Sequence, residues 1–295
     1  MAHHVLWGML GPGPSLSLTS FLSIPEVRAR FRKEFHVPPT RLKANILAQP
    51  VTRNFSLVGT AFDYLLRFYL ERLNPNCMKQ TWVAEHAISL IHDHPELFKQ
   101  IEQKADELFS NAKSAYESYM EHGKIDDPLV RSTISLAELD TIFRSGIVDS
   151  NFGKADDGDV LDLKKLIEIV PSEQFKAKNI CVLNPTFGAG SELVGGADAD
   201  LLIDDVLLDI KTTKEASLSQ EYYNQLIGYY ILWKIGGAIG SLKECKISAL
   251  GIYFSRHARL HTIPINIVEE NVHFGEFIDW FKEKAKQEYS SEDLQ

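Results

Sequence analysis

A stretch of alternating apolar and charged residues between Gly196 and Lys211 constrains the fold more than any other feature of the sequence. Two alternating runs are separated by Asp204 and Asp205, which is the pattern of an antiparallel β-hairpin. A turn centred on these two residues fixes how the strands pair, with residue 203 opposite 206, 202 opposite 207, 200 opposite 209 and 198 opposite 211. The sequence therefore predicts both the hairpin and its register.

This register gathers charged side chains on one face of the hairpin. Directly opposed residues share a face, and side chains along a strand alternate between faces. We therefore expect four charged residues on the same side, namely Asp198, Asp200, Asp209 and Lys211. The opposite side carries only apolar residues and is predicted to pack on the core, as Leu201, Ile203, Val206, Leu208 and Ile210 do not belong in water.

Asp200 and Asp209 would repel each other across the hairpin unless a cation lay between them. Mg²⁺ prefers oxygen ligands and typically takes one or two carboxylates, keeping its other positions for water and phosphate. Lys211 could then orient or deprotonate an attacking water and stabilise charge on a phosphate. The alternative interpretation is a solvent-exposed polar face on which Lys211 pairs with Asp198.

The rest of the chain divides into a helical N-terminal half and a mixed C-terminal half. Helices are expected at about residues 15–35, 58–73, 135–145, 159–170 and 217–235, and across most of 81–122. Strands are expected at 179–184, in the hairpin, at 247–254 and at 259–268. Gly188 and Gly190 do not complete a phosphate-binding glycine motif, so a turn between strands is expected there.

Three motifs resemble those of the PD-(D/E)xK nucleases, and specifically of their RecB-like branch; two lie in the C-terminal half of the chain and one lies near its start. The first is Asp200 followed, after the hairpin, by Asp209-Ile-Lys-Thr. The second is Gln225-x-x-x-Tyr229, whose spacing places both side chains on one helix face. The third is a serine-rich helix start at Ser17 with Gly59-Thr-Ala-Phe-Asp63, where Asp63 stands at the position of the branch's histidine ligand.

The resemblance implies an α/β fold with a restriction-endonuclease-like core, a central mixed sheet flanked by helices, and a large helical insertion. The corresponding division is an N-terminal helical part of the core (1–75), the insertion (76–155) and the core with the catalytic hairpin (156–295). It implies a Mg²⁺- or Mn²⁺-dependent deoxyribonuclease. The metal ligands would be Asp63, Asp200, Asp209 and the backbone carbonyl of Ile210.

Lys211 would assist the nucleophile, and Gln225 and Tyr229 would position Lys211 or the substrate backbone. A carboxylate at position 63 suits Mg²⁺ at least as well as a histidine does, although Asp63 could instead form only an i, i+4 pair with Arg67. The alternative function is a catalytically silent binding subunit of a DNA-processing complex.

Charge and composition limit the partners. The formal net charge of −9 argues against a protein that coats nucleic acid by bulk charge, and hints that a protein partner supplies substrate specificity. Between Glu26 and Arg53, however, seven basic residues face two acidic ones, which indicates either a phosphate-contacting surface or a solvated helix face. We expect a cytoplasmic protein without a membrane span, and three scattered cysteines predict neither a disulfide framework nor an iron–sulfur site.

Overall fold

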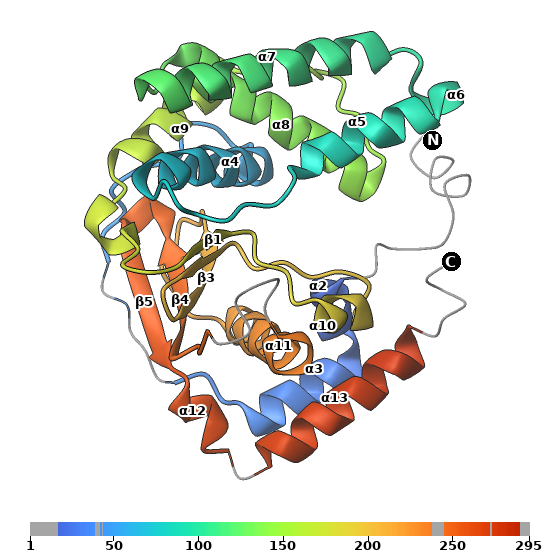
Figure 1. Cartoon of the computed structure of the whole chain (residues 1–295), viewed down its shortest axis with the longest axis vertical. Coiled ribbons are helices and arrows are strands. Elements are labelled where there is room, and N and C mark those ends of the chain that lie inside the picture. Colours follow the sequence, from blue (N-terminus) through green and yellow to red (C-terminus); the bar gives the residue numbers. More distant parts are fainter. Residues whose placement is uncertain (1–16, 39–41, 43, 238–244, 272, 290–295) are drawn as a thin grey trace.

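The central feature of the computed structural model is an open, mixed β-sheet (Figure 1). The structure describes residues 17–38, 42, 44–237, 245–271 and 273–289. Within these residues, one five-stranded sheet has the strand order β1-β2-β3-β4-β5. Its strands are β1 (Cys181–Leu183), β2 (Leu201–Ile203), β3 (Val206–Lys211), β4 (Ala249–Phe254) and β5 (Arg259–Pro264). Only the pairing of β3 with β4 is parallel.

Helices cover both faces of the sheet (Figure 1). One helical layer consists of α4 (Phe55–Leu73), α5 (Val83–Asp93), α6 (Pro95–Phe98), α7 (Glu102–His122), α8 (Asp127–Ser145) and α9 (Asp157–Glu168). The other contains α2 (Leu18–Ser23), α3 (Pro25–Glu34), α10 (Ala189–Leu193), α11 (Gln220–Gly236), α12 (Asn266–Glu269) and α13 (Phe274–Glu288). The predicted α/β arrangement of a mixed sheet flanked by helices is therefore confirmed.

The hairpin forms with the predicted turn and register over three residue pairs. Leu201 opposes Leu208, residue 202 opposes 207, and Ile203 opposes Val206, around the turn at Asp204, whose φ is +50°. The prediction that pairing continues to 200 opposite 209 and 198 opposite 211 is wrong. The chain before Leu201 leaves β3 and pairs instead with the segment that follows β1, where Asp198 forms a β-bridge with Thr186. Both faces of the hairpin are also buried, because α11 and its neighbours cover the second face.

Several expected helices have different limits in the structure. The helix expected over 15–35 is broken at Ile24, because Pro25 opens a second helix in the favoured first position. The turn expected around Gly188 and Gly190 contains the short helix α10, which packs against α11. A Cβ atom at Gly190 would lie 2.3 Å from the Leu232 carbonyl oxygen, so only glycine permits this approach. Helix α13 was not predicted from the sequence.

A buried ion pair ties β4 to the N-terminal helical layer. The Arg256 guanidinium, which follows β4 and is 0% exposed, contacts both carboxylate oxygens of Asp162 on α9 at 2.7 and 3.0 Å. The Arg256 carbonyl also accepts hydrogen bonds from the N–H groups of Leu47 and Ala48. Ser255, one residue earlier, donates to the Lys211 carbonyl. This corner therefore supports the end of β3, where the predicted site residues lie.

No helix among the described residues is long and apolar enough to cross a bilayer.

Candidate metal centre

The end of β3 presents a buried carboxylate and a cation side by side. Asp209 is 3% exposed, and one of its carboxylate oxygens lies 2.7 Å from Lys211 Nζ. Burial raises the pKa of Asp209 above its usual value, although Lys211 opposes this shift. Burial alone would lower the pKa of Lys211, but Asp209 and Asp200 raise it overall. The neighbouring carboxylates therefore favour the protonated form of Lys211.

Helix α11 holds Lys211 from the other side. Lys211 Nζ donates to Gln225 Oε1 at 2.9 Å, and Gln225 Nε2 donates to the Tyr229 hydroxyl oxygen at 2.9 Å. The helix begins at Gln220 after the N-cap Ser219 and ends before Gly237, so its frame places positions 225 and 229 on the face toward the sheet. Burial and then the carboxylates of Asp209 and Asp200 raise the pKa of Tyr229 far above normal. The structure thus joins Lys211, Gln225 and Tyr229 in one chain of hydrogen bonds.

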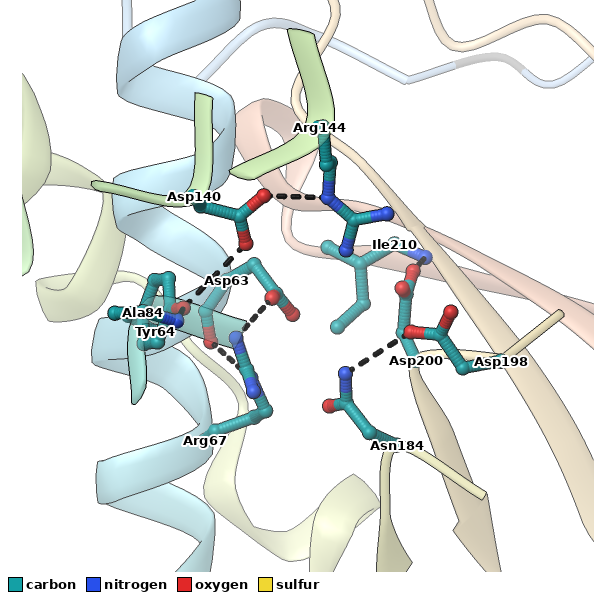
Figure 2. Close-up of polar contacts among 10 residues, drawn as sticks. All are labelled: Asp63, Tyr64, Arg67, Ala84, Asp140, Arg144, Asn184, Asp198, Asp200 and Ile210. Atoms are coloured by element: carbon teal, nitrogen blue, oxygen red, sulfur yellow. Dashed lines mark hydrogen bonds and ion pairs between the residues drawn. The ribbon is translucent and has the colours of Figure 1, made fainter. Parts of the chain in front are cut away.

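Asp200 precedes β2 and lies close to Asp209, although the two residues are not paired in the ladder. Its Oδ2 accepts a hydrogen bond from the Ile210 N–H at 2.5 Å, and this side-chain contact takes the place of the missing backbone pairing (Figure 2). Burial, followed by repulsion from Asp209 and Asp63, raises the pKa of Asp200 well above its normal value. A carboxyl group surrounded in this way ionises readily only when a cation compensates its charge.

Asp63 reaches the same region from α4 (Figure 2). Its Oδ2 lies 2.6 Å from Arg67 Nη2, so the i, i+4 pair considered for these residues is present. Its Oδ1 is buried and has no hydrogen-bond partner among the described residues. Burial raises the pKa of Asp63, and Asp198 adds to the shift while Arg67 opposes it. An unpartnered, buried carboxylate oxygen is an available donor for a metal ion.

Four further polar residues around this centre were not predicted. Figure 2 shows Asp140 and Arg144, both from α8, above Asp63, with the Arg144 guanidinium on the side toward Ile210. The Arg144 guanidinium is held by Asp140, which also accepts from the Tyr64 hydroxyl at 3.4 Å. From the sheet side, Asn184 Nδ2 donates to Asp198 at 3.2 Å. The i, i+4 spacing of Asp140 and Arg144 is visible in the sequence, but nothing there places the pair beside a hairpin more than fifty residues away.

The charges of these groups are only partly balanced. If all were ionised, the five carboxylates would exceed the three cations by two charges. The carboxylates are those of Asp63, Asp140, Asp198, Asp200 and Asp209, and the cations are Arg67, Arg144 and Lys211. That excess equals the charge of one divalent ion. In the described part of the chain, no three His, Cys, Asp or Glu side chains stand together as a ready metal cage. The donors nevertheless fit a hard cation, because they are oxygens that are largely removed from solvent and only partly compensated by cations.

The exposed-face alternative does not describe this hairpin. Asp209 is buried, and Lys211 pairs with Asp209 on its own strand, whereas Asp198 accepts from Asn184. Asp63, Asp200, Asp209, Lys211, Gln225 and Tyr229 therefore lie in one buried region. For Ile210, the structure places the N–H against Asp200.

If Asp63 contributes a metal ligand, Asp63→Asn should reduce the stabilisation that Mg²⁺ gives. At an Mg²⁺ concentration of about 100 times its Kd, the parent should gain about 2.7 kcal/mol in unfolding free energy. A tenfold loss of affinity would reduce this gain to about 1.4 kcal/mol. Thermal melting with Mg²⁺ and with chelator measures both values. Equal gains in the two proteins would show that Asp63 is not a ligand, and Asp106→Asn, on the surface of α7, is the matched control.

Comparisons of this chain with protein-family models, with curated proteins and with solved structures gave no match. The geometry of the centre and the motifs within it are therefore the basis for a function.

Proposed function

We propose that this chain is a metal-dependent nuclease that hydrolyses DNA phosphodiester bonds on a PD-(D/E)xK-type core. One observation carries the proposal. Asp200, Asp209 and Lys211 meet at the end of one hairpin, with Asp209 buried, Asp200 and Lys211 partly buried, and Lys211 fixed by Gln225. Burying two acidic side chains beside each other costs stability, and neither is needed to fill the core. A bound divalent cation would compensate the charge of these carboxylates and so explain why the arrangement is present.

Asp200, Asp209, the Ile210 carbonyl and Asp63 would hold Mg²⁺ or Mn²⁺. When bound, the ion would supply Lewis-acid activation of a water and of a phosphate oxygen. The Lys211 ammonium, oriented by Gln225 and Asp209, would position that water and stabilise negative charge developing on the phosphate. Tyr229 fixes the Gln225 amide and thereby the direction of Lys211.

Two arginines on the helical side suit the same reaction. Arg67 is 8% exposed and pairs with Asp63, so its role is to hold that carboxylate in place. Arg144 has a more exposed side chain, at 54%, and lies at the rim of the centre beside Asp140. Its guanidinium could contact a substrate phosphate with paired N–H donors. A protein partner that supplies substrate affinity accords with the net charge of −9.

The test is incubation of the purified protein with linear, circular and single-stranded DNA, each with Mg²⁺, with Mn²⁺ and with chelator. We expect the parent protein to cleave DNA only when a metal is present. Asp209→Asn, purified in the same way, should not cleave DNA. Cleavage of circular DNA would reveal an endonuclease. If parent and variant are equally inactive on every substrate although calorimetry detects bound metal, the core is a silent binding subunit. If no metal binds either, the metal centre is wrong as well.

A further inference from the structure

A groove adjoins the metal centre on the side of α11. It has a volume of about 570 Å³ and lies between α2 and α3 on one side and the first turns of α11 on the other. Its lining includes Gln225, whose amide oxygen accepts from Lys211. The groove, which we call the α3–α11 groove, therefore reaches the hydrogen-bond partner of Lys211, the residue that would act on the scissile phosphate.

Two arginines give this groove a positive wall. Arg28 and Arg32 are one helical turn apart on α3, both are exposed, and both line the groove. Neither makes an ion pair or a side-chain hydrogen bond with any described residue. Like charges at this spacing disfavour the helix slightly, so the pair is unfavourable until an anion binds. Glu221 is the one acidic residue in the lining, and it leaves a net positive charge.

Arg30, between them in sequence, has a different environment. Its Nε lies 2.9 Å from Glu34 Oε1, and its guanidinium carbon lies 5.4 Å from the centre of the Trp280 ring. Arg30 therefore braces α3 against α13 and does not line the groove. The basic stretch of the sequence thus separates into a groove-lining pair and a structural arginine, while Arg53 lies elsewhere, near α9. Arg41 and Lys43 lie outside the described residues.

The size and the other walls of the groove indicate what it holds. A cavity of this volume matches a ligand of nucleotide size, whereas a double helix is far too wide. Leu22, Pro25 and Ala29 supply an apolar surface. Gln220 Nε2 donates to the Phe35 carbonyl and to Asn224 Oδ1, so the amide atoms left for a ligand are Gln220 Oε1 and Asn224 Nδ2. The groove therefore offers arginines to phosphate groups, an apolar wall to a base and amide atoms to the edge of that base, which together are complementary to a nucleotide.

We propose that the α3–α11 groove binds an unpaired nucleotide next to the scissile phosphate, with Arg28 and Arg32 on the flanking phosphates. This inference rests on the proposed function and specifies its substrate as a strand that is single-stranded at this point. The groove would hold the strand while Gln225, in its lining, keeps Lys211 directed at the phosphate to be cut.

The test measures binding without cleavage. Fluorescence anisotropy with a labelled single strand and with a duplex of the same sequence, in chelator and over a range of salt concentrations, compares the parent with Arg28→Gln/Arg32→Gln and with Arg30→Gln. We expect the double variant to bind the single strand roughly tenfold more weakly. Its salt slope should fall by about 1.4, from the loss of two phosphate contacts. Arg30→Gln should bind like the parent, and Arg28→Lys/Arg32→Lys should keep most of the slope.

Three results would overturn the proposal. An equal loss in Arg30→Gln would mean that only the bulk charge of α3 matters. Unchanged single-strand binding in the double variant would leave the groove without a role. An equal loss for duplex and single strand would assign the arginines to a double helix. Because binding is measured in chelator, these results do not depend on catalysis, and a failure of nuclease activity is recognised separately from the cleavage test.

Discussion

Asp209→Asn is expected to lower the rate of metal-dependent DNA cleavage by more than about 100-fold without unfolding the protein. Asparagine keeps the shape of the side chain but cannot supply the anionic oxygen that a divalent ion needs. It also removes the negative partner of Lys211 and one of the two carboxylates that, after burial, raise the pKa of Asp200. Asp200→Ala and Lys211→Ala should show a comparable loss, because each removes a different part of the same centre.

The stability of the Asp209 variant separates loss of function from loss of fold. A carboxyl pKa raised by burial stabilises the folded state at low pH, and this contribution is lost as pH rises through the raised pKa. At neutral pH in chelator, the neutral asparagine avoids that cost, which offsets the lost contact with Lys211. We expect melting close to that of the parent. Asp205→Asn, in the exposed turn of the same hairpin, is the matched control and should cut normally. Parental cleavage by a normally folded Asp209→Asn would refute the site.

Arg256→Met is expected to destabilise the protein more than any other single change considered for this chain. It would leave the Asp162 carboxylate, which is 1% exposed, buried without its cation. Breaking one side of such a pair costs about 3–5 kcal/mol, corresponding to a fall in Tm of roughly 6–20 °C. The loop at Leu47 and Ala48, which is bonded to the Arg256 carbonyl, should loosen as the surrounding packing weakens.

The double variant Arg256→Met/Asp162→Leu provides the control for this effect. Replacing both partners removes the uncompensated charge, so much of the lost stability should return. Urea unfolding of the parent, both single variants and the double variant gives the coupling free energy directly. If the double variant is as unstable as Arg256→Met, the damage comes from lost packing at the corner rather than from the buried charge.

The hairpin shows how far periodicity predicts a structure. Alternation and the Asp204-Asp205 turn were sufficient for the register at the three pairs nearest the turn, because a shift by one residue would reverse both faces. The same reasoning failed beyond Leu201, since it treated the hairpin as an isolated pair of strands. In the molecule, the chain around Asp198 is taken up by its contact with Thr186. The alternation of apolar and charged residues does not show which of two neighbouring segments a strand will pair with.

The candidate site was predictable where its parts are local in sequence. The spacing of Gln225 and Tyr229 predicted a shared helix face, and the two side chains are hydrogen-bonded to each other. The surroundings of Asp63 were not predictable in this way. Arg144 belongs to a separate helix, and its place beside the centre depends on how α8 packs against α4. Such a contact follows from the whole core and not from any single pattern.

The position of Arg144 has a consequence for how this protein could be shortened or rebuilt. Helix α8 belongs to the stretch expected to be an insertion, yet its Asp140 and Arg144 lie over the same carboxylates as the hairpin (Figure 2). Excising residues 76–155 would therefore not return a smaller protein with the same candidate site. It would take a cation from the centre and uncover the apolar side of α4 at the same time. A shortened protein would need a replacement for both, so this segment is better regarded as one wall of the candidate site than as an accessory.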